Sequence, residues 1–168
     1  LTALSDSDTS LTILRLSMVP SVGNHSNLRD LALTLRSGRF IWIGDGSNLK
    51  TMTAIGDVTR AVTSVLKSEC PRGARIYNVA GSHVSMKDIV TSLSEGLGIS
   101  APTLRMPSNV AFVFSRLLGG RFGVPSRERL EKFLSSDVIS SENFQHEFGV
   151  SFDTDMRAIL REYGASLI

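Results

Sequence analysis

The histidines and the cysteine of this sequence, which are common zinc ligands, are few and scattered. Three histidines, His25, His83 and His146, are isolated from one another and from the single cysteine, Cys70. Zinc sites draw on histidine, cysteine and carboxylate ligands at short spacings, so we predict no metal site. A lone cysteine also excludes an intramolecular disulfide, and it favours a reducing compartment.

The densest group of cationic side chains in the sequence could bind phosphate groups. It consists of Arg116, Arg121, Arg127 and Arg129. Such a group is either a solvated face or a contact for phosphate groups, and the sequence leaves both interpretations open. The formal net charge of +2 is too small to indicate a nucleic-acid partner.

Hydrophobic patterning indicates the elements that would position these side chains. Residues 11–19 predict a buried strand, and residues 75–80 predict a second strand parallel to it. Asp57 suits the cap of a helix between them, and Ser85 with Asp88 has the spacing of a capping box for the helix that ends at Gly98. The other elements expected in this part are a helix over 27–36, a short strand over 40–43, a turn over 44–46 and an extended piece over 52–55.

From residue 107 onward the pattern is helical. We expect helices over 110–118 and 127–133, one from 140 or 141 to 149, and one from 153 or 154 to 163. Strands followed by helices are typical of an α/β protein. Two long strands are too few for a complete parallel sheet, so we expect a fragment of a larger protein. No apolar run reaches the ~20 residues of a membrane span, and we predict a cytoplasmic protein without a membrane partner.

Three segments stand in register along the chain, at residues 12–23, 44–57 and 76–80. Together they resemble the extended short-chain dehydrogenase/reductase family, which includes nucleotide-sugar epimerases, dehydratases and reductases. The first, TILRLSMVPSVG at 12–23, resembles the family's sixth Rossmann strand and the loop after it. The second, GDGSNLKTMTAIGD at 44–57, is similar to a Gly-Asp-Gly signature that leads to an aspartate. The third, IYNVA at 76–80 before Val84 and Ser85, resembles a Tyr-Asn-Val strand before a capped helix. The ending, with DVIS at 137–140 and FG at 148–149, fits as well.

The resemblance implies an α/β fold, the carboxy-terminal part of a Rossmann-type enzyme, with NAD or NADP as the cofactor of the parent protein. The family's catalytic Tyr-x-x-x-Lys pair would lie upstream of Leu1, and its Gly-rich phosphate loop farther upstream. Tyr77 and Tyr163 lack a lysine four residues on, and no glycine triplet follows a strand. We therefore expect no catalytic residue here, no tight binding of the cofactor, and no hydride transfer by this chain alone.

The resemblance also implies contacts to a nucleotide-diphosphate sugar. Asn27 stands where the family has an asparagine at the head of a helix that contacts the diphosphate, although a helix cap explains it equally well. Lys50 replaces an arginine held against phosphates, and a solvated loop lysine is the alternative. Phe40 and Ile41 fall in the segment whose backbone meets the nucleobase, unless they simply pack in the core.

Two further pairs of residues complete the predicted set. Arg127 and Arg129 are candidates for a second phosphate-binding arginine, and no motif decides between them. Arg15 and Asp57 are expected to be structural, in the strand and at the helix cap. The loop after the first strand departs from the family pattern, with Leu16 and Met18 at positions that would lie near the nicotinamide and the sugar. These departures leave the reaction open.

We therefore expect residues 1–100 to form the last strands and helices of a Rossmann half with substrate-loop insertions. Residues 101–168 would form a helical substrate-binding region of the same structural unit. The expected function is the substrate-binding portion of an NAD(P)-dependent epimerase, dehydratase or 4-reductase, serving bacterial polysaccharide biosynthesis. A non-catalytic nucleotide sensor and a protein-interaction module are the alternatives, and a homodimer stays open.

Overall fold

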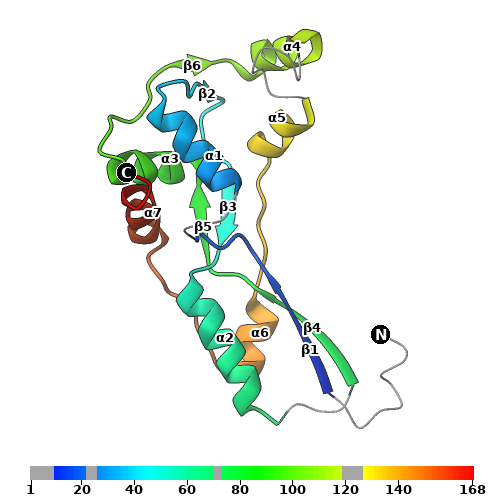
Figure 1. Ribbon diagram of the computed structural model, residues 1–168. Coiled ribbons are helices and arrows are strands. Elements are labelled where there is room, and N and C mark those ends of the chain that lie inside the picture. The colour runs from blue at the N-terminus through cyan, green and yellow to red at the C-terminus, as the bar shows by residue number, and fades with distance from the viewer. Residues whose placement is uncertain (1–9, 22–25, 70–72, 119–126) are drawn as a thin grey trace.

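The computed structural model describes residues 10–21, 26–69, 73–118 and 127–168, with the backbone alone at 114–118 and 129. Its elements are strands and helices in mixed order (Figure 1). The strands are β1 (Ser10–Leu16), β2 (Trp42–Ile43), β3 (Leu49–Met52), β4 (Gly73–Val79), β5 (Ser82–Ser85) and β6 (Arg105–Met106). The helices are α1 (Asn27–Arg36), α2 (Ile55–Lys67), α3 (Met86–Gly96), α4 (Ser108–Leu118), α5 (Arg127–Leu134), α6 (Glu142–Phe148) and α7 (Met156–Ala165).

One end of the molecule is built on a two-stranded parallel sheet. β1 pairs with β4 over its whole length, from Ser10 opposite Gly73 to Leu16 opposite Val79, as the sequence predicts. Helices α2 and α6 lie beside this sheet (Figure 1). The core between them contains Tyr77 and Phe144, whose rings meet edge to face at 5.8 Å. Aromatic burial of this kind supplies most of the apolar area in so small a core.

The larger core joins three helices to short strands. α3 packs along α7, and α1 packs against α3. The contact between α3 and α7 is close because glycines face each other: a Cβ on Gly164 would lie 3.1 Å from Cα of Gly96. Apolar side chains of β2, β3 and β5 complete this core, among them Trp42, Met52 and Val84.

The strand predictions need correction in length and burial. The first strand ends at Leu16 rather than at residue 19, and its side chains are half-buried or exposed because, within the described residues, β4 is its one partner strand. The extended piece expected over 52–55 lies instead at 49–52, where it pairs antiparallel with β5. β5 and β6 were not predicted, since four and two residues are too short to show a period.

Two capping assignments were wrong. Asn27 is the first helical residue of α1, and Ser26 is the cap, its hydroxyl accepting from the Arg29 amide at 3.3 Å. Helix α2 begins at Ile55 after Ala54, so Asp57 lies inside its first turn. The capping box is confirmed: the Asp88 amide donates to the Ser85 hydroxyl at 3.1 Å. The predictions for Cys70 and His25 lie outside the described residues.

The helices predicted for the second half are confirmed to within a few residues, as α4 to α7. Asp155, one residue beyond the expected start, caps α7 by accepting from the amides of Arg157 and Ala158. Within the described part of the chain, no helix is both long and apolar enough to cross a membrane.

Candidate functional site

Some of the residues predicted to contact a substrate lie close together in the structure. Strand β3 carries Lys50 in a buried position, and the Lys50 ammonium donates to the carbonyl of Lys132 in α5 at 2.9 Å. Phe40 is buried against α5 as well, with its ring 6.4 Å from that of Phe133. The structure therefore brings Phe40 and Lys50 to the helix that begins with Arg127.

Lys50 is tied to the chain itself. Its Nζ lies 2.6 Å from Oδ2 of Asp137, in the segment that follows α5. Backbone bonds hold the same segment against β3: the Thr51 amide donates to the Asp137 carbonyl at 3.0 Å, and the Asp137 amide donates to the Leu49 carbonyl at 2.8 Å. An ion pair of a buried lysine with a carboxylate satisfies a charge that would otherwise be costly to bury. The sequence offered no sign of this partner, which lies 87 residues away.

The other residues predicted to contact a substrate lie on the surface or outside the described residues. Asn27 and Ile41 are exposed. Arg127 is exposed and pairs with Glu131 one turn later, at 2.7 Å. The side chain of Arg129 lies outside the described residues. An exposed cation in a weak surface pair can exchange its partner for a ligand phosphate at little cost.

Arg15 and Asp57 have different surroundings. Arg15 lies in β1, as expected, and its side chain is exposed. Asp57 is buried, and its carboxylate accepts from the Thr154 hydroxyl at 2.8 Å and from the Arg60 guanidinium. Asp57 thus links α2 to the segment that leads into α7.

The turn at Gly44–Gly46 holds a carboxylate close to β3. Asp45 accepts from both the amide and the hydroxyl of Ser47, at 3.0 and 2.7 Å. These hydrogen bonds, with the backbone bond as the larger effect, lower the pKa of Asp45. Gly44 and Gly46 both have positive φ, at 77° and 75°, which explains the glycines that frame the turn.

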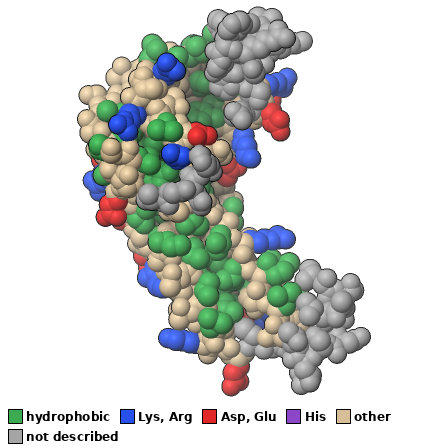
Figure 2. Space-filling model, in the orientation of Figure 1, with side chains coloured by type: hydrophobic (Ala, Val, Ile, Leu, Met, Phe, Trp, Pro, Cys, Tyr) green, Lys and Arg blue, Asp and Glu red, His purple; other side chains and the backbone are tan. Residues whose placement is uncertain are grey.

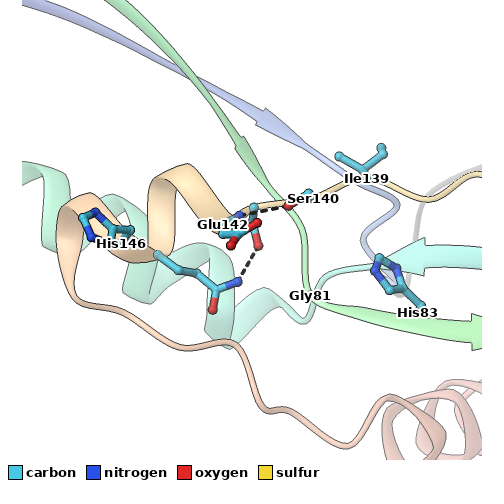
Figure 3. A pocket seen from close by; sticks show the side chains of 8 residues that line it. Gly81, His83, Ile139, Ser140, Glu142 and His146 are labelled. Carbon is cyan, nitrogen blue, oxygen red and sulfur yellow. Dashed lines mark hydrogen bonds between the residues drawn. The ribbon is translucent and has the colours of Figure 1, made fainter.

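A cavity of about 300 Å³ lies where β4 leads into β5 (Figure 3). Its lining comes from that turn, from the segment after Asp137 and from α6, and comprises Gly81, His83, Ile139, Ser140, Ser141, Glu142, Gln145 and His146. None of these residues was predicted to contact a substrate. Among the described residues, no cluster of three or more histidine, cysteine or carboxylate side chains could hold a metal ion.

The hydrogen bonds of Thr51 decide how His83 is protonated. The Thr51 hydroxyl donates its one proton to the carbonyl of Asp137 at 2.8 Å and accepts from the amide of Ile139 at 3.0 Å. Nδ1 of His83 lies 2.9 Å from the same hydroxyl oxygen. With the hydroxyl proton directed to the Asp137 carbonyl, Nδ1 is the donor in this contact, and a neutral ring then carries its proton on Nδ1 and has Nε2 free to accept.

No protein-family model matches the chain. In sequence it is 25% identical over 135 residues to the N-acetyl-α-D-glucosaminyl-diphospho-ditrans,octacis-undecaprenol 4-epimerase of Escherichia coli O157:H7. It resembles the structure of human epimerase family protein SDR39U1 with NADPH, at 22% identity and a TM-score of 0.65, and UDP-glucuronic acid 4-epimerase of Bacillus cereus with UDP-glucuronic acid and NAD, at 18% and 0.60.

The sequence is similar to that of an epimerase, and the fold is similar to that of extended short-chain dehydrogenase/reductases. The chain's α/β fold with parallel strands is the Rossmann-type fold of that family. The aligned parts are 76% of this chain in the E. coli epimerase, 95% in the human structure and 94% in the B. cereus structure. They correspond to 40%, 50% and 46% of those proteins, so the chain spans half or less of its relatives' length.

Proposed function

We propose that this chain is the substrate-binding portion of an NAD(P)-dependent enzyme that epimerises, dehydrates or reduces a sugar carried on a diphosphate. The observation that carries the proposal is the 135-residue alignment with an epimerase. In this proposal residues 1–100 contribute the end of the Rossmann half, and residues 101–168 the helical substrate region. The catalytic Tyr-x-x-x-Lys pair and the Gly-rich loop would belong to a longer polypeptide, and the chain alone would be inactive.

The diphosphate carrier has two candidate classes. The B. cereus relative was solved with a UDP-sugar, and the E. coli relative is named for a sugar on undecaprenyl diphosphate. Both carriers present adjacent anionic phosphates, which arginine and lysine bind well. We propose Asn27, Lys50 and either Arg127 or Arg129 as the groups near the diphosphate. The Phe40–Ile41 backbone would meet a nucleobase where the carrier has one.

Of these groups, Arg127 is the one whose contribution is easiest to test. Its guanidinium is exposed, and its partner among the described residues is Glu131 on its own helix, so its removal should leave the fold intact. Titration calorimetry of the chain with UDP and UDP-N-acetylglucosamine should detect binding, and Arg127→Ala should weaken it about tenfold. Arg161→Ala is the matched control, because Arg161 is an exposed arginine in a similar weak pair with Glu95 on α3.

Two results would count against the proposal. The first is the absence of any heat with either nucleotide, which would remove a nucleotide-linked substrate from this chain. The second is an equal loss of affinity in Arg127→Ala and Arg161→Ala, which would indicate a general electrostatic effect rather than a phosphate contact.

A non-catalytic relative is the second candidate function. The observation that favours it is the ion pair of Lys50 with Asp137, which commits the predicted phosphate ligand to the chain itself. Calorimetry on a longer polypeptide containing this chain would separate the two candidates. Binding of the sugar nucleotide without binding of NAD or NADP would favour the sensor, whereas binding of both would favour the enzyme.

A further inference from the structure

The ammonium of Lys50 is enclosed, and the carboxylate that neutralises it lies toward the solvent. The side chain of Lys50 is 9% exposed, whereas that of Asp137 is 54% exposed. The ammonium also donates to the carbonyl of Lys132 in the last turn of α5, where a helix leaves its carbonyl groups without partners of its own. This second bond holds Lys50 in place even when its carboxylate partner moves.

The backbone that carries Asp137 is fastened to β3 independently of the carboxylate. The Thr51 amide donates to the Asp137 carbonyl at 3.0 Å, and the Asp137 amide donates to the Leu49 carbonyl at 2.8 Å. The Thr51 hydroxyl donates to the same Asp137 carbonyl, and the Leu49 amide donates to the Ser136 hydroxyl at 3.1 Å. The carboxylate can therefore turn away from Nζ of Lys50 while the segment stays attached.

We propose that Asp137 is an intramolecular competitor of the substrate's diphosphate for Lys50. In the free chain the carboxylate pairs with the ammonium. In the complex a phosphate oxygen takes this place, and the carboxylate turns into the solvent. The inference deepens the proposed function and rests on it, because it requires that the diphosphate binds at Lys50. It adds control of that site by a residue of the chain itself.

The exchange of one anion for another leaves no charge uncompensated. The enclosed ammonium stays paired, which avoids the high cost of an isolated buried charge. The released carboxylate regains its hydration, since more than half of the Asp137 side chain is already exposed. Two anions at Nζ would repel each other, so a bound phosphate favours the outward position of Asp137. The competition should weaken diphosphate binding about fivefold, as expected for an ion pair with a solvated partner.

The outer surface of α5, beside Lys50, carries charges of both signs. Arg127 and Lys132 are exposed on this helix, and so are Glu128 and Glu131. Figure 2 shows basic and acidic side chains together at α5. Charges that nearly balance attract an anion weakly. The loss of one negative charge at Asp137 should therefore change the attraction for a diphosphate measurably.

Titration calorimetry of the 168-residue chain tests the competition. The probes are UDP and inorganic pyrophosphate, which share the diphosphate and differ in the nucleoside. Asp137→Asn removes the charge and keeps an oxygen that accepts from Nζ, so it should bind the probes about fivefold more tightly than the parent chain. Asp137→Ser removes the charge with a smaller side chain and should also bind more tightly. Lys50→Met added to Asp137→Asn should abolish the gain.

Glu95→Gln is the matched control for the change of charge. The Glu95 side chain is 54% exposed, as is that of Asp137, and it pairs with Arg161 of α7. This variant should bind both probes as the parent chain does. An equal gain in Glu95→Gln and Asp137→Asn would indicate a general effect of net charge and would overturn the competition. Circular dichroism melting establishes that the variants are folded.

Nuclear magnetic resonance measures the movement of the carboxylate directly. The ¹³C carboxyl signal of Asp137, assigned by its loss in Asp137→Asn, should shift when either probe binds, because the carboxylate leaves the ammonium. The amide protons of Thr51 and Asp137 should keep their protection against hydrogen exchange, because the backbone bonds persist. An unchanged carboxyl signal, or a loss of that protection, would contradict the exchange of side-chain partners.

The calorimetry separates this inference from the proposed function. Binding that depends on Lys50 but is equal in Asp137→Asn and the parent chain would refute the competition and leave the proposed function standing. Binding unaffected by Lys50→Met would place the diphosphate elsewhere and refute the competition as well. Absence of binding to both probes in every variant would count against both. Binding of pyrophosphate alone, with the gain in Asp137→Asn, would support the competition and count against a nucleotide carrier.

Discussion

Nζ of Lys50 lies 2.6 Å from Oδ2 of Asp137, across 87 residues of sequence. The pair is asymmetric, because the side chain of Lys50 is 9% exposed whereas that of Asp137 is 54% exposed. It fastens the segment after α5 to β3, next to the backbone bonds between Thr51 and Asp137. Because Asp137 already neutralises the Lys50 ammonium, a ligand phosphate would have to compete with this carboxylate for Nζ.

Removal of the exposed partner should cost more than removal of the buried one. Asp137→Ala leaves the Lys50 ammonium buried with the Lys132 carbonyl as its named partner, and we expect a loss of about 2 kcal/mol in the free energy of unfolding. Lys50→Met leaves only a solvated carboxylate and keeps the side-chain length, so we expect a loss below about 1 kcal/mol. Urea denaturation monitored by circular dichroism measures both.

The double variant and Asp137→Asn are the controls. Asp137→Asn keeps an oxygen that accepts from Nζ, so its loss should lie between those of the two single variants. The double variant should be no less stable than Asp137→Ala, since it removes the unpaired charge. If Asp137→Ala and Lys50→Met lowered the free energy of unfolding equally, the burial of an unpaired Lys50 would carry no additional cost.

His83 should show one tautomer when its ring is neutral. With the single proton of the Thr51 hydroxyl directed to the Asp137 carbonyl, Nδ1 of His83 is the donor and carries the ring proton. The ¹⁵N chemical shifts of the imidazole in long-range ¹H–¹⁵N spectra distinguish the two tautomers. We expect a protonated Nδ1 and an unprotonated Nε2 for His83. Thr51→Val removes the acceptor and should restore a tautomer mixture, and an Nε2-protonated ring in the parent chain would contradict the assignment.

The pH dependence of the aromatic core should come from Tyr77. Burial raises the pKa of Tyr77 above its usual value of 10.0, with a smaller contribution from the hydrogen bond to Glu147. Its folded pKa is raised, so Tyr77 contributes stability that is fully present below pH 10.0 and is lost as the pH rises through the folded pKa. We expect the melting temperature to fall with rising alkaline pH more steeply in the parent chain than in Tyr77→Phe.

Absorbance of tyrosinate at alkaline pH gives the second measurement. The parent chain should show ionisation of Tyr77 only above the range of an exposed tyrosine, and the corresponding absorbance step should be missing in Tyr77→Phe. A step for Tyr77 at the ordinary pKa would show that its ring is hydrated rather than packed against Phe144.

The sequence predicted well the elements that are defined by local patterns. The strands β1 and β4, the box of Ser85 with Asp88 and the four helices after residue 107 all follow from residue patterns or capping residues within one segment. Short elements were missed because they carry no such pattern: β6 has two residues, too few to show a period.

The surroundings of the candidate site could not be predicted, because they depend on contacts between distant segments. Nothing near Lys50 in the sequence indicates that Asp137 neutralises it, and nothing near His83 indicates that Thr51 fixes its proton. A motif identifies the position of a residue in the chain, whereas its charge balance depends on what the fold brings against it. The placement of Asn27 one residue inside α1 has a different, local cause, since Ser26 caps equally well on sequence grounds.

The packing of α3 on α7 should be the most sensitive contact of the larger core. A Cβ at Gly96 would overlap the backbone carbonyl of Arg161 and lie 3.0 Å from the backbone nitrogen of Ala165. Backbone atoms cannot move aside as a side chain can, so α7 would have to shift away from α3. We expect Gly96→Ala to lower the free energy of unfolding by about 3 kcal/mol, measured by urea denaturation.

Gly56→Ala provides the matched control for this prediction. Gly56 lies in the first turn of α2, and a Cβ there would meet nothing within 4 Å. Alanine favours the helix over glycine, so Gly56→Ala should leave the stability unchanged or raise it by about 0.5 kcal/mol. A Gly96→Ala chain as stable as Gly56→Ala would mean that α3 and α7 are farther apart in solution. In that case Met156 and Leu160 of α7 would have lost their burial against α3.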